Sequence, residues 1–437
     1  TARIARKLTG PTDVKRTVLT IVLSSLATLV VVLLVLNLSA GEKQIEHRLA
    51  REYTTEDPQF RRSLGALLGP PLVSGNRVEV LVNGDRIFPA MLDAIRGARQ
   101  TITFETYIYW SGTIGREFAD ALIERAQSGV AVHVLLDWVG SAKMEQHLID
   151  EMQTAGVEIE RFHKPSGVTL SKLNNRTHRK LLIVDGAVGF TGGVGIADIW
   201  RGDAQDEDHW RDTHFRVTGP VVAQIQAVFM DNWIKATGRV LHGEAYFPAL
   251  RAQGEHLAQM FSSSPTGGSE SMHLMYLMAI TAAQRSIDLS SAYFVPDELT
   301  VQAMIAAARR GVRIRIITPG QIIDAEVVRK ASRAQWGRLL EAGIEISEYQ
   351  PTMYHCKVMI VDSLLVSVGS TNFDNRSFRL NDEANLNVLD SEFALRQVEI
   401  FEADLERSRR ITLEQWQQRP LREKLLERLA SLLRYQL

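Results

Sequence analysis

The sequence predicts an α/β protein of two similar α/β/α lobes, related by a pseudo-twofold axis and preceded by an N-terminal transmembrane helix. Three observations lead to this prediction. A long uncharged apolar run lies near the N-terminus, one order of strand-like and helix-like segments occurs twice, and one short polar motif ends both copies. Because strands that alternate with helices form sheets with helices on both faces, we expect largely parallel sheets.

The apolar run comes first along the chain. No charged residue occurs from Thr17 to Gly41, and at about 1.5 Å per residue a helix over 18–36 is long enough for a bilayer core of about 30 Å. The alternatives are a buried core helix and a cleaved secretory signal ending at Ser39 and Ala40. The run exceeds the roughly 7 to 15 apolar residues of a signal. Residues 1–41 are therefore predicted to form a basic segment and a retained transmembrane helix, with a linker over 42–76.

The repeat predicts a first lobe over 77–250 and a second lobe over 251–410. Strand-like TITFETYIYW matches SIDLSSAYFVPD, and the next strand, in SGVAVHVLLD, matches the one in RGVRIRIITP. His178 follows Gly156 by 22 residues, whereas His355 follows Gly343 by only 12. The additional residues of the first copy fall in a turn-rich stretch around 163–175. We expect either a loop beside the first motif or a plain surface insertion.

The last segment, 411–437, is predicted to contain an amphipathic helix. Its leucines recur at helical spacing, with Arg and Lys on the remaining face; they are Leu421, Leu425, Leu426, Leu429, Leu432 and Leu433. Such a helix either lies on a membrane interface or packs its apolar face against the globular body. Packing against the body is the commoner arrangement, and we expect it here.

The motif that ends both copies is HxKxxxxD. His178, Lys180 and Asp185 form the first copy; His355, Lys357 and Asp362 form the second. Because side chains alternate between the faces of a strand, each histidine projects with its lysine. Cys356, the only cysteine, points the other way, and its counterpart is Arg179. We therefore expect Cys356 to pack in the core and not to act as a nucleophile.

If the two lobes face each other, the motifs place two imidazoles and two ammonium groups around one anion, and phosphate fits this charge. One histidine can attack phosphorus while the other protonates the leaving alcohol, which gives a phosphohistidine intermediate. The lysines and the turn donors can stabilise the developing charge, so we expect no metal and no cofactor. Asp212 and Glu383 are the candidates for holding the imidazole tautomers, unless they are surface salt-bridge partners.

These residues carry a resemblance. The doubled motif, the GG and GSTN turns, FETYIYW, YFVPD and the WRD that precedes a GP resemble the phospholipase D superfamily, and within it the bacterial cardiolipin synthases. The resemblance covers roughly 77 to 410. It implies two phospholipase D-like lobes, a phosphohistidine intermediate, and transfer of a phosphatidyl group between two phosphatidylglycerol molecules with release of glycerol.

The resemblance also implies roles for particular residues. The catalytic set comprises the motif residues and two further acids: His178, Lys180, Asp185, His355, Lys357, Asp362, Asp212 and Glu383. The acids at positions 212 and 383 would bond the histidines, and substrate phosphate would lie at the turns that contain Ser370, Asn372 and Gly193. Gly195 stands where many relatives have asparagine, so either the two halves bind phosphate unequally or a larger lipid group is accommodated. Both histidines meet the requirements of a nucleophile, and the resemblance favours His178.

The balance of charged residues limits the kinds of molecule that the chain is expected to bind. Lys plus Arg (50) nearly equals Asp plus Glu (51), so the strong positive field of a nucleic-acid-binding protein is missing. The expected partners are phosphatidylglycerol and other phospholipids of a membrane, with no nucleic acid. A hydrolase that gives phosphatidic acid and a membrane-tethered nuclease remain alternatives. The location implied is the bacterial inner membrane, spanned once. Basic residues before the span favour a periplasmic catalytic part.

Overall fold

The computed structural model describes residues 11–38, 45–162, 175–265, 270–434 and 436. The stretch 163–174, expected to be a loop or an insertion, therefore lies outside the described residues. The chain divides into two compact units, of which the first is Thr1–Ala40 with Pro165–Asn174 and the second is Gly41–Lys164 with Asn175–Leu437. Each unit is described by itself.

In the first unit, the described structure is helix α1 (Pro11–Leu38). It includes the apolar run at 18–36, and the described leucine and valine side chains of that run are exposed. The side chains of residues 30, 31 and 33–38 lie outside the described set. Among the residues that are described, no helix combines the length and the apolar character needed to cross a membrane.

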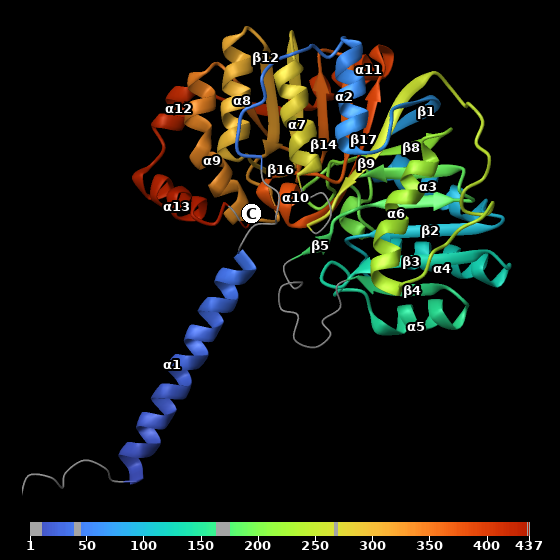
Figure 1. The fold of residues 1–437 in the computed structure, drawn as a ribbon, viewed down its shortest axis with the longest axis horizontal. Helices are drawn as coiled ribbons and strands as arrows, with labels where there is room; N and C mark the ends of the chain where they lie inside the picture. The colour runs from blue at the N-terminus through green and yellow to red at the C-terminus, as the bar shows by residue number, and fades with distance from the viewer. Residues whose placement is uncertain (1–10, 39–44, 163–174, 266–269, 435, 437) are drawn as a thin grey trace, which may run out of the picture. The chain divides into compact units, whose positions relative to one another are not determined.

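The second unit is built on a sixteen-stranded mixed sheet (Figure 1). At its centre, β1 (Val73–Val82) pairs antiparallel with β9 (His256–Ser263). From β1 outward the strands are β8 (Thr213–Thr218), β7 (Val188–Gly192), β6 (Leu181–Val184), β2 (Thr101–Thr106), β3 (Ala131–Asp137) and β4 (Glu158–Phe162). From β9 outward they are β17 (Asn381–Leu389), β15 (Leu365–Gly369), β14 (Lys357–Val361), β10 (Ser286–Ser291), β12 (Arg313–Pro319), β13 (Glu345–Tyr349) and β18 (Ser408–Ile411). Up to β13, the strands follow one order on both sides of the centre.

The expectation of largely parallel sheets is wrong. The long strands β2, β3 and β4 and their counterparts β10, β12 and β13 run parallel, whereas the long strands nearer the centre pair antiparallel. The reason is local. The motif strands β6 and β14 are followed by the tight turns at 185–187 and 362–364, which can only produce antiparallel hairpins.

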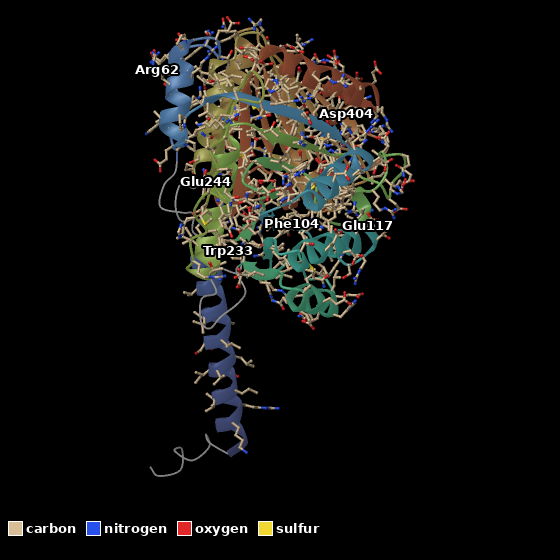
Figure 2. The ribbon with its side chains drawn as sticks, turned by 90° about the vertical axis from the view of Figure 1, so that its right-hand side faces the viewer. Arg62, Phe104, Glu117, Trp233, Glu244 and Asp404 are labelled. Atoms are coloured by element: carbon tan, nitrogen blue, oxygen red, sulfur yellow. The ribbon has the colours of Figure 1, made fainter. Side chains whose placement is uncertain are left out.

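Helices cover both faces of this sheet. In the first half, α3 (Gly84–Arg96), α4 (Thr113–Gln127) and α5 (Gln146–Thr154) pack on the face that Phe104 of β2 points to. The neighbouring Thr103 bonds Gln226 of α6 (Val222–Thr237) on the opposite face. In the second half, α7 (Ser271–Ala282), α8 (Glu298–Arg309) and α9 (Glu326–Glu341) lie over one face, and α11 (Ser391–Glu406) covers the other. Figure 2 labels Phe104 on β2 and Trp233 on α6, which belong to the cores on opposite faces.

Residues 42–76, expected to be a linker, contribute to the core. Helix α2 (Pro58–Leu68) buries Phe60, Leu64 and Leu68 among the side chains of α7 and the second-half strands. These three residues are spaced four apart, so they form one apolar stripe. After β18, the chain continues as α12 (Leu413–Gln417) and α13 (Leu421–Ser431).

Candidate active site

The two motifs meet because each half pairs its motif with the other half. Strand β5 (Arg176–Thr177) runs parallel to the start of β17, and the His178 amide donates to the Asp382 carbonyl at 2.9 Å. In the mirror arrangement, the His355 amide donates to the Arg211 carbonyl at 2.8 Å. Each histidine is thus anchored to the residue that precedes the acid of the opposite half.

The two histidines bond the two predicted acids crosswise. Nδ1 of His178 lies 3.0 Å from both carboxylate oxygens of Glu383, and Nδ1 of His355 lies 2.7 Å from Oδ2 of Asp212. Both acids are completely buried (0% exposed), so they are not surface salt-bridge partners. A carboxylate only accepts, so Nδ1 carries the proton and Nε2 is left with its lone pair.

Both histidines are held neutral. Burial, together with the nearby Lys180 and Lys357, lowers the pKa of His178 to about 4, although Glu383 acts in the opposite direction. Burial and the adjacent Lys357 likewise lower the pKa of His355. A neutral imidazole with a free Nε2 is the form that can attack an electrophile.

The two motif lysines are buried beside the histidines. Lys180 donates to the His178 carbonyl at 2.6 Å, and Lys357 donates to the His355 carbonyl at 2.8 Å. The Lys357 ammonium is also 3.3 Å from Nε2 of His355. Burial and the charge of Lys357 lower the pKa of Lys180 to about 7, and burial lowers that of Lys357. The two buried ammonium groups repel each other, and an anion bound beside them would offset this repulsion. The site therefore favours binding of an anion.

Each acid has its own supporting donors. Glu383 accepts hydrogen bonds from the Ser370 hydroxyl and, at 3.2 Å, from the Asn381 amide. Asp212 accepts from the indole N–H of Trp200 at 3.0 Å. Burial opposes ionisation of these acids, but the pKa of each stays below its usual value because its histidine partner and a lysine stabilise the carboxylate.

The predicted substrate-binding turns lie beside these acids. A Cβ added at Gly193 would be 2.2 Å from Oδ1 of Asp212, so this glycine makes room for the acid. Ser370 bonds Glu383, and Asn372 is buried with its Oδ1 lacking a hydrogen-bond partner in the described structure. Gly195 offers no free volume, because an added Cβ would be 2.8 Å from Ile108 and 3.1 Å from the Trp200 ring. The indole of Trp200 therefore occupies the space that was expected to accept a larger lipid group.

The motif aspartates are not beside the histidines. Asp185 follows β6, at the opposite end from Lys180, and accepts hydrogen bonds from the amides of residues 99, 100 and 101. Asp362 does the same with residues 284, 285 and 286. At about 3.3 Å per residue, the intervening strand separates each aspartate from its lysine by roughly 16 Å. Their expected catalytic role is corrected to fastening the motif hairpin to the start of β2 or β10.

Cys356 lies where strand parity predicts it. Its side chain is 1% exposed in a core cluster with Val358 and Ile360. Burial raises the pKa of its thiol to about 12, which leaves it protonated and unreactive. Arg179, its counterpart, is also buried and donates to the Val228 carbonyl at 2.8 Å.

Two comparisons with known proteins bear on this site. A family model described as "Cardiolipin synthase, PLD-like domain" matches residues 91–230 and 276–405, and each matched range contains one motif. The chain belongs to this cardiolipin synthase family. It is 35% identical to "Cardiolipin synthase 2" of Bacillus anthracis, over 89% of this chain and 76% of that one. It is also 35% identical to "Cardiolipin synthase A" of Pseudomonas syringae pv. syringae, over 81% and 74% of the two chains.

Solved structures show the same fold at low identity. The phosphatidylserine synthase of Haemophilus influenzae superposes with a TM-score of 0.69 at 15% identity, covering 87% of this chain and all of that one. At this identity the likeness concerns the fold alone.

Three aromatic residues of this family member complete the site, and sequence reasoning assigned them no role. Tyr107 packs edge-on against His178, with ring centroids 5.3 Å apart. Trp200 and Trp210 each lie 5.4 Å from the ring of His355. Tyr107 lies in FETYIYW, Trp200 in IADIW and Trp210 in HWRD, but nothing in the spacing of these strings indicated contact with the histidines.

Proposed function

We propose that this chain is a phosphatidyltransferase that makes cardiolipin from two phosphatidylglycerol molecules and releases glycerol. The observation that carries the proposal is the crossed site. Two neutral histidines, each held by an acid of the opposite half, lie with two buried lysines in one place. The names of the related proteins, cardiolipin synthases, support the same activity.

In the first step, Nε2 of His178 attacks the phosphorus of one phosphatidylglycerol. The bond from phosphorus to the glycerol headgroup oxygen breaks, and His355 donates its Nε2 proton to that oxygen. The negative phosphodiester raises the pKa of the nearby imidazole, which allows His355 to carry this proton. The choice of His178 as the nucleophile rests on the resemblance to the superfamily.

In the second step, His355 takes the proton of a glycerol hydroxyl on a second phosphatidylglycerol. The oxygen attacks the phosphohistidine, the P–N bond breaks, and His178 is regenerated. Lys180, Lys357 and the side-chain amide of Asn372 stabilise the charge on the non-bridging oxygens in both steps. Ser370 and Asn381 hold Glu383, and through it the ring of His178.

The domain organisation and location belong to the same proposal. The strand order repeated about β1 and β9 supports two lobes over 77–250 and 251–410. The uncharged run from Thr17 to Gly41 supports a single anchor in the bacterial inner membrane, and the basic residues before it favour a periplasmic catalytic part. Protease digestion of intact spheroplasts tests the orientation, because only a periplasmic catalytic part would be cleaved.

Product analysis tests the reaction. The detergent-solubilised chain is incubated with phosphatidylglycerol that carries an isotopic label in its headgroup glycerol. We expect cardiolipin and labelled free glycerol in equal amounts, detected by mass spectrometry. Phosphatidic acid without cardiolipin would establish the hydrolase instead.

A further inference from the structure

Helix α13 turns its apolar face outward. Its leucines are between 38% and 83% exposed: Leu421, Leu425, Leu426, Leu429, Leu432 and Leu433. The side chains that it buries are Glu427 (3% exposed) and Ala430 (7%). The expectation that the leucine face packs against the globular body is therefore wrong.

Buried ion pairs hold the helix in this orientation. Glu427 bonds Arg419 at 2.7 Å and Arg333 of α9 at 3.2 Å. Ala430 packs against Val328 and Ala331, also on α9. Rotating the leucines inward would leave the Glu427 carboxylate without these partners, and an unpaired buried charge is strongly destabilising. The exposed apolar face is thus a feature of the folded state.

The residues that follow this helix adjoin the active site. The carbonyl of Arg434 accepts from the Asn375 amide at 3.1 Å, and that of Gln436 accepts from Arg376 at 3.0 Å. Both donors lie on α10 (Asn375–Arg379), which begins three residues after Asn372 in the phosphate-binding turn. Figure 1 shows α13 beside α9.

The charges around the leucines are mostly positive. Arg422 and Arg428 are exposed and Lys424 is half-buried, whereas Glu423 is the exposed acid on this turn of the chain. Basic residues that border an apolar helix face are typical of helices that lie in the interface of an anionic membrane. Pairing of this face with a second copy would bring the same positive charges together.

A smaller apolar surface adjoins the first motif. Trp138 and Val139 are each 37% exposed, directly after β3. Asp137, the last residue of β3, accepts a hydrogen bond at 3.0 Å from the amide of Thr177, the neighbour of His178. An exposed tryptophan beside the site fits the headgroup level of a bilayer.

We propose that α13 is a membrane-docking helix. Its leucine face lies at the boundary between headgroups and acyl chains of an anionic phospholipid surface. The contacts of the helix with α9, and those of the residues that follow it with α10, place the histidine site against the headgroups. The inference rests on the proposed function, since it states how the lipid substrates reach that site.

Site-specific quenching tests this docking in the full chain. Cys356 is buried, so a thiol-reactive, environment-sensitive fluorophore labels an introduced cysteine. Leu429→Cys probes α13, and Leu395→Cys on α11 is the matched control, because the two leucines are 53% and 55% exposed. With phosphatidylglycerol vesicles that carry brominated acyl chains, we expect quenching at position 429 and none at 395. Equal fluorescence at both positions would overturn the proposal, as would shielding of the label at 429 by self-association without vesicles.

A kinetic experiment separates docking from catalysis. Leu425→Gln combined with Leu429→Gln is expected to lower the rate of cardiolipin formation on vesicles by roughly tenfold, with little change in mixed detergent micelles. Leu395→Gln should change neither rate. An unchanged rate on vesicles would refute docking and leave the proposed function intact. If the unmodified chain formed no cardiolipin on vesicles and none in micelles, the proposed function itself would be refuted.

Discussion

Each acid bonds a histidine of the opposite half. We therefore expect that replacing an acid impairs the same reaction step as replacing the histidine that it bonds. In Glu383→Gln, a neutral amide replaces the carboxylate that lies 3.0 Å from Nδ1 of His178. As Nε2 forms its bond to phosphorus, the imidazole becomes positive, and the carboxylate stabilises that charge. For unit charges about 4 Å apart at an effective dielectric constant of about 20, the attraction is about 4 kcal/mol. Loss of it slows formation of the phosphohistidine by roughly a thousandfold.

Rapid-quench kinetics with headgroup-labelled phosphatidylglycerol measures this step, because labelled glycerol is released when the phosphohistidine forms. We expect Glu383→Gln to lose the burst of glycerol, as His178→Ala does. Because His355 protonates the leaving glycerol, Asp212→Asn should match His355→Ala, and both should regain a burst with a p-nitrophenol headgroup, which leaves without a proton, whereas His178→Ala and Glu383→Gln should not. Far-UV circular dichroism and thermal melting establish that each variant is folded. Glu383→Gln with a burst at the wild-type rate, or an Asp212→Asn variant that behaves like His178→Ala, would refute the crossed assignment.

Three further predictions follow from buried groups of the same site. Burial lowers the pKa of His178 to about 4, so kcat/KM in micelles should fall below about pH 4, where this imidazole protonates. It should also fall as the pH rises toward and above 7, because His355, whose pKa is lowered, must carry a proton and Lys180, with a pKa of about 7, must be an ammonium; a profile flat from pH 5 to 9 would contradict this. Cys356→Ala should retain most activity and lower the free energy of unfolding by about 1 kcal/mol, whereas His355→Ala should lose nearly all turnover. If Cys356→Ala were folded but inactive, the thiol would again be a candidate nucleophile. Asp185→Ala removes the acceptor of three backbone amides and should lower the free energy of unfolding by about 2 to 4 kcal/mol in denaturant titrations. The burst of glycerol should be preserved at low temperature. Loss of the burst in the folded variant would show that this aspartate is catalytic.

Patterns in the sequence, such as residue spacing along one strand and the repeated order of segments, were enough to predict many of the site residues and the fold class. The doubled motif identified His178, Lys180, His355 and Lys357, and strand alternation placed Cys356 in the core, because both depend on spacing along one strand. The repeated order of segments indicated an α/β fold in two similar halves. Asp212 and Glu383 were also found, since each lies about one strand beyond its motif.

Other properties depend on which segments meet in space. The sequence does not show that Glu383 bonds His178, which is 205 residues away. Nor does it show that Asp185, which follows β6 at the end away from Lys180, accepts hydrogen bonds from amides at the start of β2. The orientation of α13 was expected wrongly because its apolar stripe alone favours burial, whereas the ion pairs of Glu427 with Arg419 and Arg333 turn that stripe outward. The sequence by itself therefore determined the chemistry of the site residues and their local geometry. Tertiary structure decided which of them act together, because long-range hydrogen bonds and buried charges are satisfied only by partners that folding brings into contact.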